Sequence, residues 1–71
     1  MVNLRDAILK NQNAYYKGLI AKHQQNVELY LNHPVGIGEH SDVMGTIDGE
    51  INAIAQAHEK IEIINHYFLN R

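Results

Sequence analysis

The chain has 71 residues, no cysteine, 45% hydrophobic residues, 20% charged residues and a formal net charge of −2. This length allows one domain, and a core of this size supplies only about 3–5 kcal/mol of net stability without a disulfide, a metal or a second chain. The lack of cysteine excludes disulfides and thiolate zinc sites, and the composition is that of a folded protein rather than a disordered one. Association with another chain is therefore the expected source of additional stability.

The apolar segments of the sequence are short. None approaches the roughly 18–20 residues that a membrane span requires, and the first six residues lack the apolar core of a secretory signal. We therefore expect a cytoplasmic protein with no membrane partner.

The charges are unevenly distributed along the chain. Residues 1–32 hold four basic and two acidic side chains, whereas residues 33–71 hold two basic and six acidic side chains. The two halves therefore attract each other. Nucleic acid is not an expected partner, because proteins that bind it usually present a dense basic patch.

Residues 3–32 predict a long helix, because this stretch has no proline, a single glycine, and apolar residues at helical spacing. The expected core positions are Leu4, Ile8, Tyr15, Leu19, Val27 and Tyr30, with Tyr16, Ile20 and Leu31 beside them. The expected solvent-facing positions are Asn3, Asp6, Lys10, Asn13, Lys17, Gln24 and Glu28. Three polar residues, Gln12, His23 and Asn26, interrupt the core stripe. Buried polar groups need partners, so we expect these three to pair across an interface, where they can fix register, or to lie at its wet edge.

Residues 33–41 predict the turn of a helical hairpin. Pro34 ends the first helix, since proline disfavours helical backbone in the residue before it. Two glycines then alternate with two apolar residues, a pattern that allows the chain to reverse while covering the end of the core. Ser41 is the expected N-cap of the second helix, with Asp42 in its first turn.

Residues 42–69 predict a second helix with the clearest periodicity in the chain. Apolar and interface-type residues recur at alternating steps of three and four, at Met44, Ile47, Ile51, Ile54, His58, Ile61, Asn65 and Phe68. This spacing is typical of coiled-coil-like packing between near-antiparallel helices that cross at roughly 20°. Gly45 and Gly49 lie on the far side of this helix, where each costs about 1 kcal/mol relative to alanine.

Together these segments predict an all-α fold, a single antiparallel two-helix hairpin with a coiled-coil-like seam. A lone hairpin leaves many apolar side chains in water, and pairing two hairpins into a four-helix bundle hides much of that surface. We therefore predict a homodimer or a higher symmetric oligomer. The expected oligomer interface consists of Tyr15, Leu19, His23, Val27, Met44, Ile47, Ile51, Ile54, His58, Ile61 and Phe68.

Five histidines raise the question of metal binding. One set at the turn consists of His33, Glu39, His40 and Asp42. A second set shares one side of the second helix and consists of His58, Glu62 and His66. The turn spacing matches no tight metal motif, and carboxylate-bridged bundles need several glutamates on facing helices, where the first helix offers only Glu28. We predict no metal and no cofactor.

An enzyme is not expected, because the chain has no cysteine nucleophile, no serine except Ser41 and no glycine-rich phosphate loop. A small-anion or nucleotide site at the turn is the alternative. The turn opens a helix N-terminus, whose amides and dipole attract anions, although Glu39 and Asp42 oppose one there. The candidate ligand-binding residues are His33, Gly36, Gly38, Glu39, His40 and Ser41.

The segment from Tyr30 to Asp42, with its Val-Gly-Ile-Gly-Glu-His turn, resembles a family of small uncharacterised proteins of tailed phages, including phages of marine cyanobacteria. The likeness extends over nearly the whole chain. It implies no activity and no site residue, only a viral accessory protein in the cytoplasm of an infected bacterium. We therefore predict a non-enzymatic helical interaction protein that binds a host or phage protein. The alternative is an oligomeric sponge that binds a small anion or nucleotide at the turn.

Overall fold

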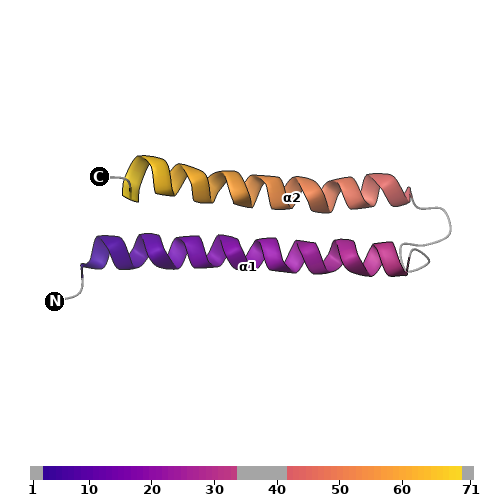
Figure 1. The fold of residues 1–71 in the computed structure, drawn as a ribbon, viewed down its shortest axis with the longest axis horizontal. Coiled ribbons are helices and arrows are strands. Elements are labelled where there is room, and N and C mark those ends of the chain that lie inside the picture. The colour runs from indigo at the N-terminus through magenta and orange to yellow at the C-terminus, as the bar shows by residue number, and fades with distance from the viewer. Residues whose placement is uncertain (1–2, 34–41, 70–71) are drawn as a thin grey trace.

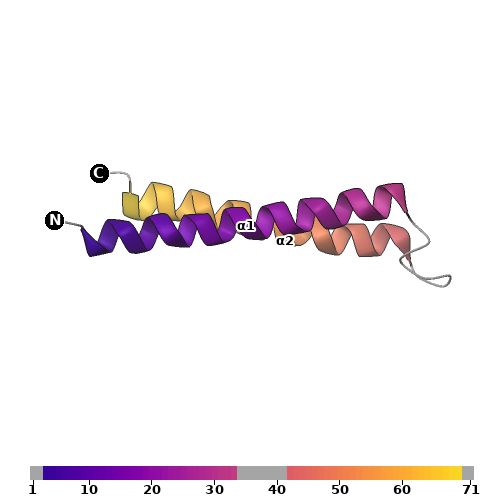
Figure 2. The same ribbon diagram turned by 90° about the horizontal axis from the view of Figure 1, so that it is seen from below.

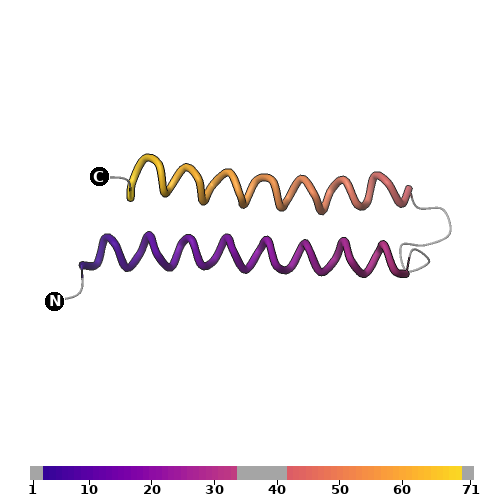
Figure 3. The backbone as a smooth tube through the Cα atoms, viewed as in Figure 1, coloured from indigo at the N-terminus to yellow at the C-terminus, as the bar shows by residue number. Residues whose placement is uncertain are grey.

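The computed structural model describes residues 3–33 and 42–69, which form two antiparallel helices lying side by side (Figure 1). Helix α1 spans Leu4–Asn32, helix α2 spans Val43–Ile64, and a π-helical turn, η2 (Asn65–Leu69), continues α2. The two backbones follow each other along their length, so the start of α1 and the end of η2 lie at the same end (Figure 3). There are no strands in these ranges, and the predicted all-α hairpin is confirmed.

The hairpin is a single layer of two helices. It measures 55 × 20 × 14 Å, and the smallest dimension is little more than the roughly 10–12 Å diameter of one helix with its side chains. Seen after a turn of 90°, α1 crosses in front of α2 at a shallow angle (Figure 2). Both broad faces of the layer are therefore open, and only the strip between the helices is covered by protein.

Local hydrogen bonds set the two ends of α1. Asn3 has an extended backbone, with φ −78° and ψ 107°, and its side-chain oxygen accepts the N–H of Asp6 at 3.3 Å, as an N-cap residue does. At the other end the N–H of His33 donates to the carbonyl oxygen of Leu29 at 2.8 Å. His33 then leaves the helical region, with φ −139° and ψ 66°; the proline that follows it in the sequence disfavours helical backbone at this position.

Helix α2 begins one residue later than the sequence suggested. Asp42 is the N-cap, with φ −78° and ψ 100°, so its predicted place in the first turn is wrong; Ser41, the predicted N-cap, lies outside the described residues. The carbonyl oxygen of Asp42 accepts the N–H of Thr46 at 3.0 Å. A Cβ atom on Gly45 would lie 2.6 Å from Oδ2 of Asp42. The glycine therefore leaves space for this carboxylate.

The interface between the helices has the alternating spacing of three and four on both sides. On α1 the half-buried residues that follow it are Leu9, Asn13, Tyr16, Ile20, His23, Val27 and Tyr30. On α2 the half-buried or buried residues that follow it are Val43, Ile47, Glu50, Ile54, Ala57, Ile61 and Ile64. Only Ala57, at 3% exposure, and Ile64, at 7%, are fully buried among the described residues. The single chain thus has a very small core.

The orientation of α2 differs from the predicted one. Ile47, Ile54 and Ile61 face α1 as expected, but Met44 is 82% exposed, and Ile51 and His58 also face water. Their places are taken by the residues one position before them, Val43, Glu50 and Ala57. Compared with the prediction, α2 is therefore rotated about its own axis, so that the side with Val43, Glu50 and Ala57 faces α1.

Two features of the sequence explain this rotation. Ala57 is 3% exposed, and its small side chain fits between the two helices. Glu50 is polar, yet α1 supplies two hydrogen-bonding side chains to its carboxylate, and a buried carboxylate is tolerated when it is paired in this way. Hydrophobic periodicity alone favours Ile51 over Glu50, because it takes no account of cross-helix pairing.

Helix α1 shows a related correction. The predicted core residues Leu4, Ile8 and Tyr15 are exposed to water. Asn13, predicted on the solvent side, instead faces α2 and donates from Nδ2 to Oδ1 of Asn65 at 2.9 Å. The apolar stripe predicted on α1 therefore lies to one side of the residues that face the other helix in the structure.

The π-helical turn η2 changes which residue faces α1 at the terminal end of the hairpin, where α1 begins and η2 ends. In an α-helix, Phe68 would follow Ile64 on the same side, four residues later. A π-helical turn adds about one residue per turn, so Leu69, five residues after Ile64, is half-buried and Phe68 is 48% exposed. The prediction that the regular seam extends to Phe68 is therefore wrong for contacts within the chain.

No helix in the described ranges combines the length and the apolar character needed to cross a membrane.

Candidate functional site

A polar cluster joins the second half of α1 to the first half of α2 across the interface between them. Nδ1 of His23 is 2.5 Å from Oε2 of Glu50, and Nδ2 of Asn26 donates to both carboxylate oxygens, at 3.3 and 3.2 Å. A carboxylate can only accept, so Nδ1 of His23 carries the proton. Both side chains of the His23–Glu50 pair are largely covered, at 21% and 17% exposure. The donors of α1, one turn apart, thus hold a single carboxylate of α2.

This arrangement stabilises the ionised form of the carboxylate. The hydrogen bond from His23, and then that from Asn26, lower the pKa of Glu50 below its ordinary value, against the opposing effect of its partial burial; the charges of His23 and Lys22 add to the lowering. A carboxylate held in this way is a poor proton donor near neutral pH. The cluster therefore pairs the helices, which is one of the two outcomes expected for His23 and Asn26; Gln12, the third polar interruption, is exposed.

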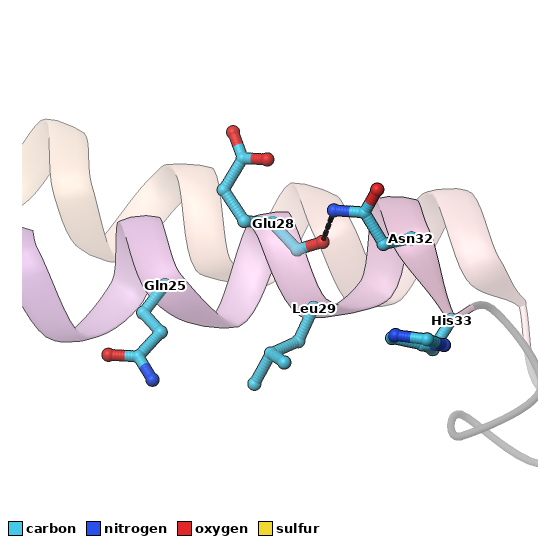
Figure 4. Close-up of a pocket in the computed structure, with 5 residues that line it drawn as sticks. All are labelled: Gln25, Glu28, Leu29, Asn32 and His33. Atoms are coloured by element: carbon cyan, nitrogen blue, oxygen red, sulfur yellow. Dashed lines mark hydrogen bonds between the residues drawn. The ribbon is translucent and has the colours of Figure 1, made fainter.

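A shallow hollow of about 420 Å³ lies beside the last turns of α1 (Figure 4). Its described lining residues are Gln25, Glu28, Leu29, Asn32 and His33. Gln25, Leu29 and His33 point to the same side of the helix, whereas Glu28 points away, and Nδ2 of Asn32 donates to the backbone oxygen of Glu28 at 2.7 Å (Figure 4).

The chemistry of this hollow is unfavourable for an anion. The C-terminal end of a helix carries a partial negative charge, and Glu28, although its carboxylate points away from the hollow (Figure 4), adds a full negative charge on the same part of α1. His33 is the one residue of the predicted turn site that the structure describes, and it lines this hollow. The other predicted ligand-binding residues, Gly36, Gly38, Glu39, His40 and Ser41, lie outside the described residues.

The second predicted histidine set lies in water on α2. Nε2 of His58 is 3.0 Å from Oε1 of Glu62, and both side chains are about two-thirds exposed. His66 instead packs against its neighbour Tyr67, with ring centroids 4.7 Å apart in an edge-to-face arrangement. In residues 3–33 and 42–69 no group of three or more histidine, aspartate or glutamate side chains is arranged to hold a metal ion.

Large apolar side chains on the surface are the most extensive feature available for binding. Those on α1 are Leu4, Ile8, Tyr15, Leu29 and Leu31, and those on α2 and η2 are Met44, Ile51, Ile63, Tyr67 and Phe68. Single exposed apolar residues are ordinary, but ten exposed and only two fully buried, within the part of the chain that the structure describes, are not. The arrangement can bind protein surfaces, since it offers apolar area and few converging polar groups.

The predicted oligomer-interface residues divide into two groups. Those that face the other helix of the same chain are Leu19, His23, Val27, Ile47, Ile54 and Ile61, all half-buried. Those left open on the surface are Tyr15, Met44, Ile51, His58 and Phe68. Contacts between α1 and α2 of the same chain partly cover the first group, whereas the second group is accessible to another chain.

Sequence reasoning missed Glu50 and Leu69. The signal for Glu50 was a second heptad series, in which Val43, Glu50, Ala57 and Ile64 stand seven residues apart. No sequence signal marked Leu69, because its position depends on the π-helical turn.

Comparison of the chain with models of protein families, with curated proteins and with solved structures found no match.

Proposed function

We propose that this protein is a non-enzymatic interaction protein, which works as a homodimer of helical hairpins arranged in a four-helix bundle. One observation carries the proposal: among residues 3–33 and 42–69, ten large apolar side chains are exposed, whereas two residues are fully buried. An isolated hairpin with these exposures has little to hold its helices together. A second copy of the same chain carries the same exposed apolar side chains, so two copies can cover each other.

The size of the exposed surface supports the same conclusion. The chain exposes 5575 Å², whereas a compact monomer of 8.1 kDa exposes roughly 4,500 Å². The excess of roughly 1,000 Å² is similar to the area of about 800 Å² that each partner buries in a standard protein interface. The surplus is therefore of the size that one partner chain can cover.

The resemblance to tailed-phage proteins, rather than the structure, supports the setting of the proposal. In that setting the dimer acts in the cytoplasm of an infected bacterium and binds a host or phage protein. Apolar side chains near the turn, among them Leu31 and Met44, offer such a partner a contact surface separate from the terminal end of the hairpin. The anion alternative has less support, because Glu28 and a helix C-terminus border the described part of that site.

Sedimentation equilibrium combined with thermal unfolding tests the proposal. We expect a mass of twice the 8.1 kDa chain at micromolar concentration, and an unfolding temperature that rises with protein concentration, because dimerisation stabilises only the folded state. A folded species of 8.1 kDa whose unfolding temperature is independent of concentration would contradict it.

A further inference from the structure

We infer that the second copy docks on one defined surface, with the two hairpins pointing in the same direction. The inference rests on the proposed dimer and adds its interface and its symmetry. The surface, which we call the terminal-end surface, consists of Leu4, Ile8, Tyr15, Ile63, Tyr67 and Phe68.

Helical spacing and two ring contacts place the two helices' contributions on one side of the hairpin. Tyr15 and Tyr16 are neighbours, with ring centroids 5.6 Å apart, and Nζ of Lys60 lies 5.7 Å from the Tyr16 centroid. Lys60 precedes Ile63 by three residues and therefore belongs to the same stripe of α2. The apolar stripe of α1 and that of α2 thus flank the same Tyr16–Lys60 contact.

The two stripes also lie at the same end of the hairpin. Nη2 of Arg5 donates to the backbone oxygen of Phe68 at 2.7 Å, which joins the first turn of α1 to η2. Leu4 and Ile8 on one helix are therefore level with Tyr67 and Phe68 on the other. The terminal-end surface occupies one half of the molecule's length, and this asymmetry decides how two copies can pair.

A two-fold dimer places the same surface of each copy face to face, and two arrangements achieve this. With the axis along the hairpins, the terminal ends coincide and α1 of one copy lies against α2 of the other. With the axis across the hairpins, α1 lies against α1, and the terminal end of one copy covers the turn end of the other. Only the first arrangement brings the terminal-end surface of one copy onto that of the other.

Charge favours the same arrangement independently. Residues 3–33 hold four basic and two acidic side chains, and residues 42–69 hold one basic and five acidic side chains. The first arrangement sets a basic helix beside an acidic helix of the other copy. The second sets like charges beside each other, which is unfavourable. Apolar area and charge therefore both select the arrangement in which the hairpins point the same way.

The first test compares two glutamate substitutions at exposed positions. Tyr15→Glu places a charge in the terminal-end surface and is expected to weaken dimerisation at least about tenfold, because the charge must be desolvated on association. Met44→Glu, the matched control at an apolar side chain that is 82% exposed, lies outside that surface and is expected to change the dissociation constant less than about twofold. Helix content by circular dichroism confirms that both variants fold.

The second test uses the absence of native cysteine. Chains carrying Ile8→Cys and chains carrying Tyr67→Cys are mixed in a glutathione redox buffer. When the hairpins point the same way, these positions of opposite copies meet, and the mixed disulfide exceeds its statistical share. The control mixture pairs Ile8→Cys with Leu29→Cys, two residues at similar distances on either side of the middle of α1, which meet when the hairpins point in opposite directions.

The outcomes separate this inference from the proposed function. A dimer weakened by Tyr15→Glu and cross-linked between positions 8 and 67 supports the inference. A dimer that is weakened by Met44→Glu instead, or cross-linked between positions 8 and 29, overturns the inference and leaves the proposed dimer standing. A monomeric parent chain overturns both.

Discussion

His23, in the second half of α1, and Glu50, in the first half of α2, join the two helices through a contact of 2.5 Å between Nδ1 and Oε2. Asn26, one turn further along α1, donates to the same carboxylate. Apolar contacts tolerate sliding between helices, whereas two directional donors aimed at one acceptor do not. The pair therefore fixes the register of a hairpin whose small core would otherwise permit several.

Removing the charge of Glu50 is expected to destabilise the protein in a pH-dependent way. Because the folded-state pKa of Glu50 is lowered, its contribution to stability is fully present above its ordinary pKa of 4.5 and is lost as the pH falls through the lower folded-state value. Glu50→Gln should therefore unfold at a lower temperature than the parent at pH 7, and the difference should shrink as the pH falls below 4.5. Thermal unfolding followed by circular dichroism from pH 7 to pH 3 measures it.

Glu62→Gln is the matched control for this experiment, since it makes the same chemical change in the exposed His58–Glu62 pair. Surface pairs of this kind contribute little, so the unfolding temperature should be close to that of the parent. Equal effects of the two substitutions, or a constant difference for Glu50→Gln at every pH, would contradict the role assigned to the His23–Glu50 pair.

Truncating Ile64 and Ile51 distinguishes the observed interface from the predicted one. Ile64 is 7% exposed, so Ile64→Ala removes buried apolar volume and should lower the free energy of unfolding by about 2–4 kcal/mol. Ile51 is 50% exposed, and Ile51→Ala should cost less than about 1 kcal/mol. Urea denaturation of both variants provides the comparison, and a larger loss for Ile51→Ala would show that α2 is oriented as periodicity suggested.

Sequence periodicity predicted the helices well and their facing sides less well. The end of α1 was readable from Pro34 after His33, a local signal that needs no tertiary information, whereas Asn3, predicted as a helix position, is its N-cap. The positions Ile47, Ile54 and Ile61 were also readable, because they belong both to the seam predicted from the sequence and to the observed interface. Residues at the edge of an apolar stripe could not be assigned in the same way.

The errors have two physical causes. Glu50 and Asn13 face the other helix because each meets a hydrogen-bonding partner there, and such pairing depends on residues more than 20 positions away in the chain. Leu69 replaces Phe68 because a π-helical turn shifts the register, which hydrophobic spacing does not reveal. The sequence predicted that the polar residues His23 and Asn26 need hydrogen-bonding partners. Only the structure identified Glu50 as the partner that they share.

Replacing Gly18 by alanine is expected to stabilise the protein. A Cβ atom at Gly18 would meet no atom within 4 Å beyond its two neighbours and the backbone of its own helix, and alanine is favoured over glycine inside a helix by about 1 kcal/mol. For a chain of this size the unfolding temperature should rise by about 4–8 °C. Gly45→Ala is the contrasting variant, because its Cβ would lie 2.6 Å from Oδ2 of Asp42 and would displace that side chain. Equal gains in differential scanning calorimetry would show that the Asp42 contact does not matter.

The amide pair of Asn13 and Asn65 is expected to be less stabilising than a pair of leucines. Nδ2 of Asn13 donates to Oδ1 of Asn65, but Oδ1 of Asn13 is buried without a hydrogen-bond partner, which costs about 1–3 kcal/mol. Replacing both residues by leucine removes the unpaired oxygen and adds apolar contact across the interface, so the free energy of unfolding should rise by about 1–2 kcal/mol. Asn65→Leu alone should lower it, because it leaves Nδ2 of Asn13 without its acceptor as well. Urea denaturation of the single and double variants measures the difference, and a double variant less stable than the parent would show that the amide pair contributes net stability despite the unpaired oxygen.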